Sequence, residues 1–307
     1  MKKFILHIIY FSIALLAVLT LVDGVVTYIY HHKETRKYSV WNDILHTDID
    51  ADMLIMGNSR AWGQYSPYIL DSILHVNSFN IGMDGSCFNR QKIRYNIYRH
   101  YQRRKPDYII QNVEFFTLER TVGYEHEQFM PYILYPFFRN EIMKEEPISI
   151  AELYIPMYRY YKSNVYDDYT KYDFPQYKGY FVADEEWDSS QLMKTTPYYA
   201  IVDTATLRMF DNFMAQMQKE NIQLILVMAP MYKAAINVVL NNDEICKLYK
   251  DLASKYDVPL LDYSEISICS DTTYFRNATH LNKRGAEFFS LQLARDLDSL
   301  GIVCTSK

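Results

Sequence analysis

Three side chains in this sequence have the types and the order that nucleophilic acyl chemistry needs. Ser59 follows an apolar run in the stretch MGNSRAWG, and Asn277 and His280 lie together near the C-terminus in NATHLNKRGAEFF. Catalysis by serine requires a base that takes the hydroxyl proton, a group that orients the base, and N–H donors aimed at the developing oxyanion. Ser59 fits the nucleophile, His280 the base and Asn277 the orienting group. The backbone N–H groups of Ser59 and Gly85 are candidate donors, because glycine lets the backbone approach a ligand closely.

Strand-like and helix-like segments alternate along much of the chain. Apolar, β-branched runs predict strands at 52–57, 76–82, 107–116, 222–230 and 258–264. Helical spacing of apolar residues predicts helices at 67–74, 88–102, 205–220, 243–256 and 283–300. Asn282 is placed to cap the last helix and Gly301 to end it. The alternation predicts a flavodoxin-like, three-layer α/β/α fold with a mainly parallel sheet.

A fold of this kind explains how distant residues meet. Parallel sheets bind ligands at the carboxyl ends of their strands. Ser59 follows the first predicted strand, Gly85 follows the second, Asn112 and Glu114 end the third, and His280 lies just before the last helix. We therefore expect them at one edge of the sheet. The simplest interpretation of Glu114 is a strand-end residue that contacts a helix terminus.

The N-terminus predicts a membrane segment. Two lysines precede an almost unbroken apolar run from Phe4 to Val22, and about 20 such residues cross a bilayer. Neither a small-x-small cleavage site nor a lipobox-like cysteine follows, so we predict an uncleaved signal anchor at 1–30, with a cleaved signal peptide as the alternative. The positive flank places the N-terminus inside. The rest, beginning with a polar stalk at 31–50, is then extracytoplasmic, either periplasmic or at the cell surface.

The predicted α/β domain comprises residues 51–116 and 200–307, and its rhythm breaks between them. Fourteen of the 29 tyrosines fall in the stretch from 117 to 200, so we interpret 117–199 as an insertion with its own composition. Tyrosine offers an apolar face and a polar tip and often lines sugar-binding or interface surfaces. The tyrosines would then form one wall of a substrate groove, or they would simply pack the insertion onto the sheet.

Composition excludes some function classes. A net charge of -5 gives no general attraction to polyanions, so no nucleic-acid partner is expected. The four cysteines, Cys87, Cys246, Cys269 and Cys304, form no CxxC pair and have no histidines at metal spacing. No metal site is predicted, and one disulfide of unknown pairing remains open.

Three motifs carry a family resemblance. GNSR at 57–60 matches a G-D-S-like turn that holds a nucleophilic serine, with Asn58 where aspartate is usual. NIGMDG at 80–85 matches an N-x-G-x-x-G-like stretch, and NATHLNKRGAEFF at 277–289 matches a D-x-x-H block followed by a helix. These blocks occur in the order typical of the SGNH, or GDSL-type, hydrolase superfamily, which this sequence resembles in its membrane-anchored, bacterial envelope type.

The resemblance implies roles for further residues. It makes the serine and the histidine of the first and last blocks the nucleophile and the base, and it makes Gly85 an oxyanion donor. Asn277 occupies the position where the family carries aspartate. The family's G-x-N-D block has no match in QNVEFF, and Asn112 is the nearest asparagine and the candidate for the remaining donor. Asp271 is a substitute carboxylate if its loop folds back.

The resemblance also implies an activity. Anchored members of the family act on cell-envelope glycans, so we expect a serine esterase on acyl esters of an envelope glycan, foremost O-acetyl esters, without a metal or organic cofactor. One alternative is an O-acyltransferase that takes the acyl group from a membrane acyl-donor partner. The other is a non-catalytic glycan-binding or assembly module with a degenerate site. Asn277 and the missing block favour that module, whereas the intact Ser59 and His280 oppose it.

Overall fold

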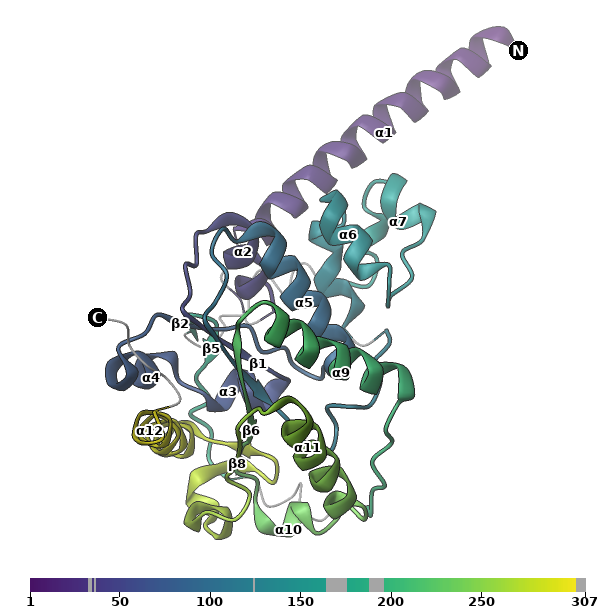
Figure 1. Ribbon diagram of the computed structural model, residues 1–307. Coiled ribbons are helices and arrows are strands. Elements are labelled where there is room, and N and C mark those ends of the chain that lie inside the picture. Colours follow the sequence, from purple (N-terminus) through teal and green to yellow (C-terminus); the bar gives the residue numbers. More distant parts are fainter. Residues whose placement is uncertain (33–34, 36, 124, 164–175, 188–195, 302–307) are drawn as a thin grey trace. The chain divides into compact units, whose positions relative to one another are not determined.

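The computed structural model describes residues 1–32, 35, 37–123, 125–163, 176–187 and 196–301 (Figure 1). The chain divides into two compact units, each built from two stretches of sequence. The first unit combines Met1–Thr47 with Val122–Asp173, and the second combines Asp48–Thr121 with Phe174–Lys307.

A five-stranded sheet forms the centre of the second unit. Across the sheet the strands are β2 (Ser78–Asn80), β1 (Met53–Met56), β3 (Tyr108–Asn112), β6 (Gln223–Met228) and β7 (Leu260–Asp262). All neighbouring strands are parallel. Numbered along the chain, their order is 2-1-3-4-5, which is the flavodoxin-like arrangement. The predicted fold class is therefore confirmed.

Helices cover both faces of this sheet (Figure 1). One face carries α4 (Pro67–Leu74) and α12 (Lys283–Ser299), and the other carries α5 (Phe88–Tyr101), α9 (Thr204–Lys219) and α11 (Asn242–Tyr256). Ile55, Ile110 and Ile225 lie side by side in register and pack against Leu70 of α4 and Phe289 of α12. Their neighbours along each strand point to the opposite face, as the alternation of strand side chains requires.

Short elements join or extend these layers in the second unit. They are α3 (Ser59–Gln64), β4 (Gln176–Tyr177), β5 (Tyr180–Phe181), α10 (Lys233–Ile236), η4 (Ser267–Ser270), η5 (Thr272–Tyr274), β8 (Phe275–Asn277) and β9 (His280–Leu281). The predicted limits of α12 are confirmed. Asn282 Oδ1 accepts a hydrogen bond of 3.0 Å from Gly285 N, and Gly301 after the helix has a φ of 61°.

The first unit is helical. It contains α1 (Lys2–His31), α2 (Ser39–His46), η1 (His126–Tyr132), α6 (Pro136–Ile142), α7 (Ile150–Tyr154) and η2 (Tyr158–Tyr160). Its core is aromatic: Trp41 is fully buried, with ring-centre distances of 5.9 Å to Phe129 and 5.1 Å to Phe138. Trp41 Nε1 donates a 3.1 Å hydrogen bond to Gln128 Oε1, so the indole is buried without losing its polar contact.

The units differ from the domains that composition predicted. The stretch 31–50 is not simply a polar stalk, because it includes α2 and its buried Trp41. The predicted insertion at 117–199 is also divided, since its end returns to the α/β unit. There Asn80 N donates to Lys178 O at 2.9 Å, and the Phe181 ring stacks 4.8 Å from that of Trp62. Tyrosine content identified an unusual stretch but not its division between two cores.

Candidate active site

The turn after β1 places Ser59 at the carboxyl edge of the sheet. Gly57 follows the strand with a φ of 149°, and a Cβ at this position would lie 2.5 Å from Ala61 Cβ. Only glycine fits both the backbone conformation and this close approach. Asn58 then caps α3, with its Oδ1 accepting a 3.0 Å hydrogen bond from Arg60 N. Ser59, the first residue of α3, is partly exposed.

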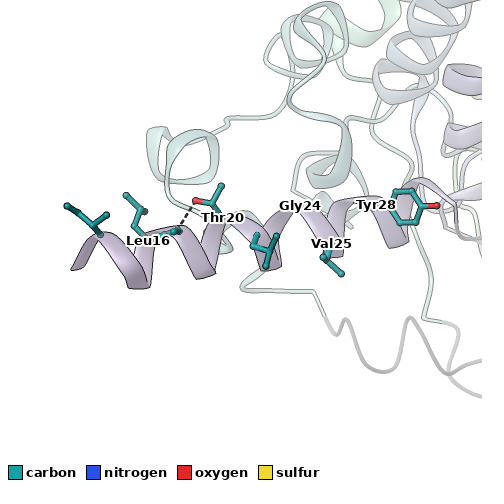
Figure 2. Close-up of a pocket in the computed structure, with 8 residues that line it drawn as sticks. Leu16, Thr20, Gly24, Val25 and Tyr28 are labelled. Atoms are coloured by element: carbon teal, nitrogen blue, oxygen red, sulfur yellow. Dashed lines mark hydrogen bonds between the residues drawn. The ribbon is translucent and has the colours of Figure 1, made fainter. Parts of the chain in front are cut away.

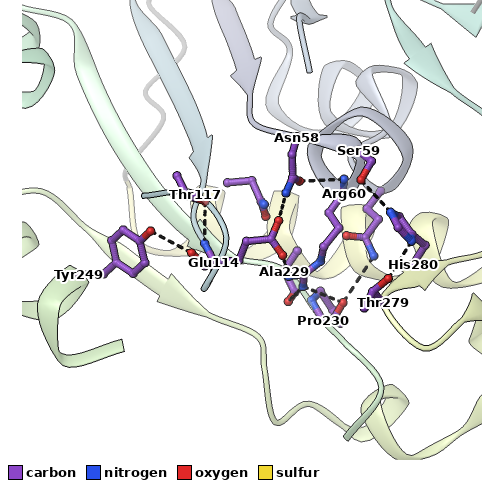
Figure 3. A network of polar contacts seen from close by, with 12 residues as sticks. Asn58, Ser59, Arg60, Glu114, Thr117, Ala229, Pro230, Tyr249, Thr279 and His280 are labelled. Carbon is purple, nitrogen blue, oxygen red and sulfur yellow. Dashed lines mark hydrogen bonds and ion pairs between the residues drawn. The ribbon is translucent and has the colours of Figure 1, made fainter. Parts of the chain in front are cut away.

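The structure brings Ser59, His280 and Asn277 together (Figure 3). Ser59 Oγ lies 2.8 Å from His280 Nε2, and His280 Nδ1 lies 3.0 Å from Asn277 Oδ1. Both distances are within hydrogen-bond range. A hydroxyl, an imidazole and an acceptor behind the imidazole are thus aligned as serine catalysis requires.

The contacts of Asn277 also fix the tautomer of the imidazole. Asn277 Oδ1 accepts hydrogen bonds from the backbone N–H groups of Thr279, at 3.1 Å, and His280, at 2.9 Å. Backbone N–H groups only donate, so the amide oxygen and not the amide nitrogen must face this turn. The same oxygen faces His280 Nδ1, which must therefore carry the proton. His280 Nε2 is left with a lone pair that accepts from the Ser59 hydroxyl.

A two-residue turn explains the spacing of three between Asn277 and His280. The two residues are paired across the antiparallel strands β8 and β9. Thr279 in the turn places its Oγ1 2.9 Å from His280 Nδ1, a contact that the sequence motif did not indicate. Asp271 is occupied elsewhere: its exposed carboxylate accepts from Thr273 N at 2.9 Å and from Thr273 Oγ1 at 2.8 Å. The two oxygens that lie beside His280 Nδ1, Asn277 Oδ1 and Thr279 Oγ1, thus belong to neutral groups.

The loop that carries Gly85 runs beside the serine turn. Met83 N donates to Gly57 O at 2.9 Å, which continues the β1–β2 pairing past the end of β2. The Asn80 side chain connects this loop to α3. Its Nδ2 donates to Ala61 O at 2.8 Å, and its Oδ1 accepts from Gly82 N at 2.8 Å. Gly85 is partly exposed in the following turn, with a φ of 57°. Its role as an oxyanion donor stays a prediction.

Asn112 lies next to the serine turn but faces the interior. It is fully buried at the end of β3, and a Cβ on Gly57 would come within 2.9 Å of its Cβ. Its Oδ1 accepts a 2.7 Å hydrogen bond from Tyr65 OH, and burial raises the pKa of Tyr65 well above its ordinary value, so the donor stays neutral. The structure does not present the Asn112 amide to solvent beside Ser59. Its assignment as an oxyanion donor also remains a prediction.

A buried ion pair behind the serine was not identified from the sequence (Figure 3). Arg60 and Glu114 form a salt bridge with side chains that are each 5% exposed, and Asn58 Nδ2 donates to the other carboxylate oxygen. Arg60 also donates to Ala229 O and Pro230 O, which follow β6. This network joins the residues on either side of Ser59 to the ends of β3 and β6. Opposite charges directly after two neighbouring strands were the signal that could have revealed it.

Further contacts hold Glu114 itself in place. Its backbone N–H donates to Thr117 Oγ1 at 3.0 Å, and its carbonyl oxygen accepts from Tyr249 OH at 2.9 Å. Burial raises the pKa of Tyr249 well above its ordinary value, which keeps the phenol as a donor. Glu114 does contact the start of a helix, as predicted, but as part of a buried network. Among the described residues, no group of three or more His, Cys, Asp or Glu side chains is placed to hold a metal ion.

Comparison with known proteins gives similarities only at the level of structure. No family model matches the sequence, and no curated protein gives a significant match. The chain is similar to a structure assigned to the G-D-S-L family of lipolytic proteins, from Desulfitobacterium hafniense, at 12% identity and a TM-score of 0.41, over 80% of this chain and 98% of that one. For a structure assigned as an acylhydrolase, from Bacteroides fragilis, the values are 11%, 0.35, 80% and 86%.

A family two carbohydrate esterase from Clostridium thermocellum, solved in complex with cellohexaose, is similar at 9% identity with a TM-score of 0.41, over 83% of this chain and 66% of that one. The chain is thus similar, at low identity, to solved structures of the lipolytic, acylhydrolase and carbohydrate esterase kinds.

Proposed function

We propose that this protein is a membrane-anchored serine esterase of the SGNH type that removes acyl groups, foremost O-acetyl groups, from glycans of the cell envelope. The observation that carries the proposal is the hydrogen-bonded line from Ser59 through His280 to Asn277. Backbone N–H groups orient the Asn277 amide, and the Asn277 oxygen in turn fixes the tautomer of His280. Ser59 and His280 are both partly exposed to solvent. A polar cluster with only a structural role has no need of an accessible hydroxyl that faces an imidazole lone pair.

The proposed reaction uses only groups of the chain and the substrate. Ser59 Oγ attacks the ester carbonyl carbon while its proton passes to His280 Nε2. The tetrahedral oxyanion accepts hydrogen bonds from the backbone N–H groups of Ser59 and Gly85. When it collapses, His280 returns the proton to the leaving sugar oxygen and the acyl group stays on Ser59. A water molecule, deprotonated by His280, then releases the carboxylic acid and restores the serine.

Asn277 sets the rate that this site can reach. Its amide oxygen holds the correct tautomer, but it lacks the negative charge that stabilises the imidazolium formed during attack. Replacement by aspartate keeps an oxygen acceptor for Thr279 N, His280 N and His280 Nδ1, and it adds that charge. The wild-type enzyme is therefore expected to turn over slowly, and Asn277→Asp to turn over faster.

Anchoring is supported by α1. Within the described residues, α1 is the one helix long and apolar enough to cross a bilayer. Its C-terminal end is part of the first unit, since Val26 and Tyr30 are buried there and His31 Nε2 lies 2.9 Å from Pro131 O. Cleavage after the apolar run would remove these contacts, which favours an uncleaved anchor. The proposal of an extracytoplasmic domain rests on the basic N-terminal flank, and that of a glycan substrate rests on the resemblance to anchored members of the family.

The test uses the full chain in detergent, because residues from the end of α1 belong to a folded unit. Hydrolysis of an activated acetyl ester and release of acetate from an O-acetylated polysaccharide are measured. The variants are Ser59→Ala, His280→Ala and Asn277→Asp, with Ser72→Ala as the control at an exposed serine of the same unit. Loss of about 1,000-fold or more is expected for the first two variants and no loss for the control.

Two other outcomes would replace the esterase proposal with a different function. If the acetyl group is released only when a glycan acceptor is present, the same Ser59–His280 pair serves an O-acyltransferase. If neither the parent nor Asn277→Asp shows hydrolysis or transfer, while the parent binds the polysaccharide, the protein is a glycan-binding module that retains the geometry of the site.

A further inference from the structure

The helix α1 changes character along its length. Residues 2–18 of the helix are all exposed, whereas from Leu19 onward one face becomes partly or fully buried within the first unit. Val26 and Tyr30 are buried and Leu19 and Asp23 are partly buried. These four positions are spaced by three and four residues, as on one face of a helix. The N-terminal part of α1 thus extends alone, and its C-terminal part is covered on one side by protein.

A polar clamp attaches the segment 157–160 to α1. Asp23 pairs with Arg159, whose side chain is 5% exposed, and Asp23 Oδ1 accepts a 2.9 Å hydrogen bond from Met157 N. One turn further along α1, Thr27 Oγ1 lies 2.6 Å from Tyr160 OH. The level of this segment along α1 is therefore fixed between residues 23 and 27.

This level coincides with the end of the apolar run. The 19 residues from Phe4 to Val22 rise about 28 Å in a helix, close to the roughly 30 Å hydrocarbon thickness of a bilayer. Asp23 is the first acidic residue after them. If the run spans the bilayer, Asp23 and the segment 157–160 lie at the boundary between hydrocarbon and headgroups.

Large apolar and aromatic side chains are exposed on the chain around this clamp. In and after α7 they are Ile150 (77% exposed), Tyr154 (78%), Ile155 (53%), Tyr158 (42%) and Tyr161 (59%). Tyrosine is enriched at membrane–water interfaces, where its ring meets acyl chains and its hydroxyl meets headgroups. Exposure of five such side chains within twelve residues is costly in water and favourable at a lipid surface.

The uncovered side of α1 is also apolar, from within the proposed membrane span to just past the clamp. An open apolar surface runs along it, formed by residues of α1 (Figure 2): Ile13, Leu16, Ala17, Thr20, Leu21, Gly24, Val25 and Tyr28. The hydroxyl of Thr20 donates to Leu16 O at 2.8 Å, so it has a partner within the helix, as lipid requires. Tyr28, past the clamp, is 64% exposed, a further tyrosine at the expected headgroup level.

We propose that the segment 150–161 is a second membrane contact, which lies in the headgroup region of the bilayer that α1 spans. This inference rests on the proposed anchoring of α1 and goes beyond it, because it assigns lipid as the occupant of an exposed face of the Tyr-rich stretch. The clamp at Asp23 and Arg159 holds the segment at that depth. Two contacts, one spanning and one interfacial, fix the tilt of the first unit on the membrane.

The test measures depth with brominated lipids, which quench tryptophan at short range. Tyr154→Trp adds an exposed indole on the segment. Leu134→Trp is the matched control, because Leu134 is 54% exposed in the same unit. Its neighbour Tyr135 lies 5.8 Å from the His31 ring, eight residues and about 12 Å beyond Asp23 along α1. Each full-length variant is placed in phosphatidylcholine–phosphatidylglycerol vesicles with and without lipids brominated near the headgroup.

The emission added by Tyr154→Trp should lose most of its intensity in the brominated vesicles, and that added by Leu134→Trp should lose little. Equal quenching of the two variants, in vesicles that float together with the protein, would overturn the interfacial contact while leaving α1 anchored. Failure of the parent chain to float with the vesicles would instead show that α1 does not anchor, and both proposals about the membrane would fall.

Discussion

Removal of either member of the buried Arg60–Glu114 pair should strongly destabilise the α/β unit. Glu114→Gln leaves a guanidinium that is 5% exposed with neutral acceptors only, namely the new amide oxygen and the carbonyl oxygens of Ala229 and Pro230. Arg60→Met leaves a buried carboxylate with only the amide of Asn58. An uncompensated buried charge costs about 3–5 kcal/mol. The double variant buries no charge, so it should be more stable than the sum of the two losses predicts, by at least about 2 kcal/mol.

The assay must report on one unit, since the chain has two. The full chain is unfolded with urea in detergent, and the unfolding is monitored by hydrogen exchange of peptides from β1 and β3. This gives the free energy of unfolding of the α/β unit. Ester hydrolysis is measured on the same samples in the absence of urea. Activity should fall in both single variants, because each weakens or removes the pairing between Arg60 and Glu114 that holds the turn of Ser59.

Small, additive losses would refute this reasoning. If each single variant cost less than about 1 kcal/mol, as exposed ion pairs do, and the double variant lost the sum, the pair would not be an energetically coupled support of the serine turn. An ion pair at the surface provides the comparison. Lys255 Nζ and Asp211 Oδ1 lie 2.6 Å apart, and the two side chains are 54% and 33% exposed. Removing either of those should cost about 1 kcal/mol or less.

Three further predictions follow from single residues. Gly57→Ala should destabilise the α/β unit by about 2 kcal/mol or more, by the same exchange assay, because its Cβ would meet Ala61 Cβ at 2.5 Å in a strained backbone; an unchanged unit would contradict this. Burial raises the pKa of Cys87 to about 12, so iodoacetamide at pH 8 should modify it far more slowly in the native chain than in urea, as peptide mass spectrometry would show. Partial burial lowers the pKa of His31, so protonation favours unfolding. The stability of the first unit should therefore be complete above about pH 6.5 and fall below it, with a smaller fall in His31→Gln.

Local patterns predicted most elements of the α/β unit. Helices at 67–74 and 283–300 agree with α4 and α12 to within a residue, because capping residues, turn residues and apolar spacing act within a few residues of one another. The third strand was predicted at 107–116, but β3 ends at Asn112. The apolar VEFF that follows looks like strand sequence, whereas Glu114 leaves the ladder to pair with Arg60. The residue just beyond the strand is thus held by contacts that the local pattern does not show.

The separation along the chain explains which parts of the site were visible. Asn277 and His280 are three residues apart, so one turn brings them together and the sequence could show their relation. Arg60 and Glu114 are 54 residues apart, and no local pattern connects them. The same holds for the clamp between Asp23 and Arg159. Arg159 lies in the stretch 117–199, for which composition indicated only a high tyrosine content.

By itself, the sequence determined the alternation of strands and helices, the apolar N-terminal helix, and the identity of Ser59, His280 and Asn277 as a candidate set. These features depend on periodicity and on motifs shorter than about fifteen residues. Only the tertiary structure decided that Ser59 Oγ lies 2.8 Å from His280 Nε2, that Asn112 faces the interior, and that residues 157–160 of the Tyr-rich stretch contact the C-terminal part of α1. Contacts between residues far apart in sequence depend on how the layers pack, because burial and buried charge pairing are properties of the whole fold.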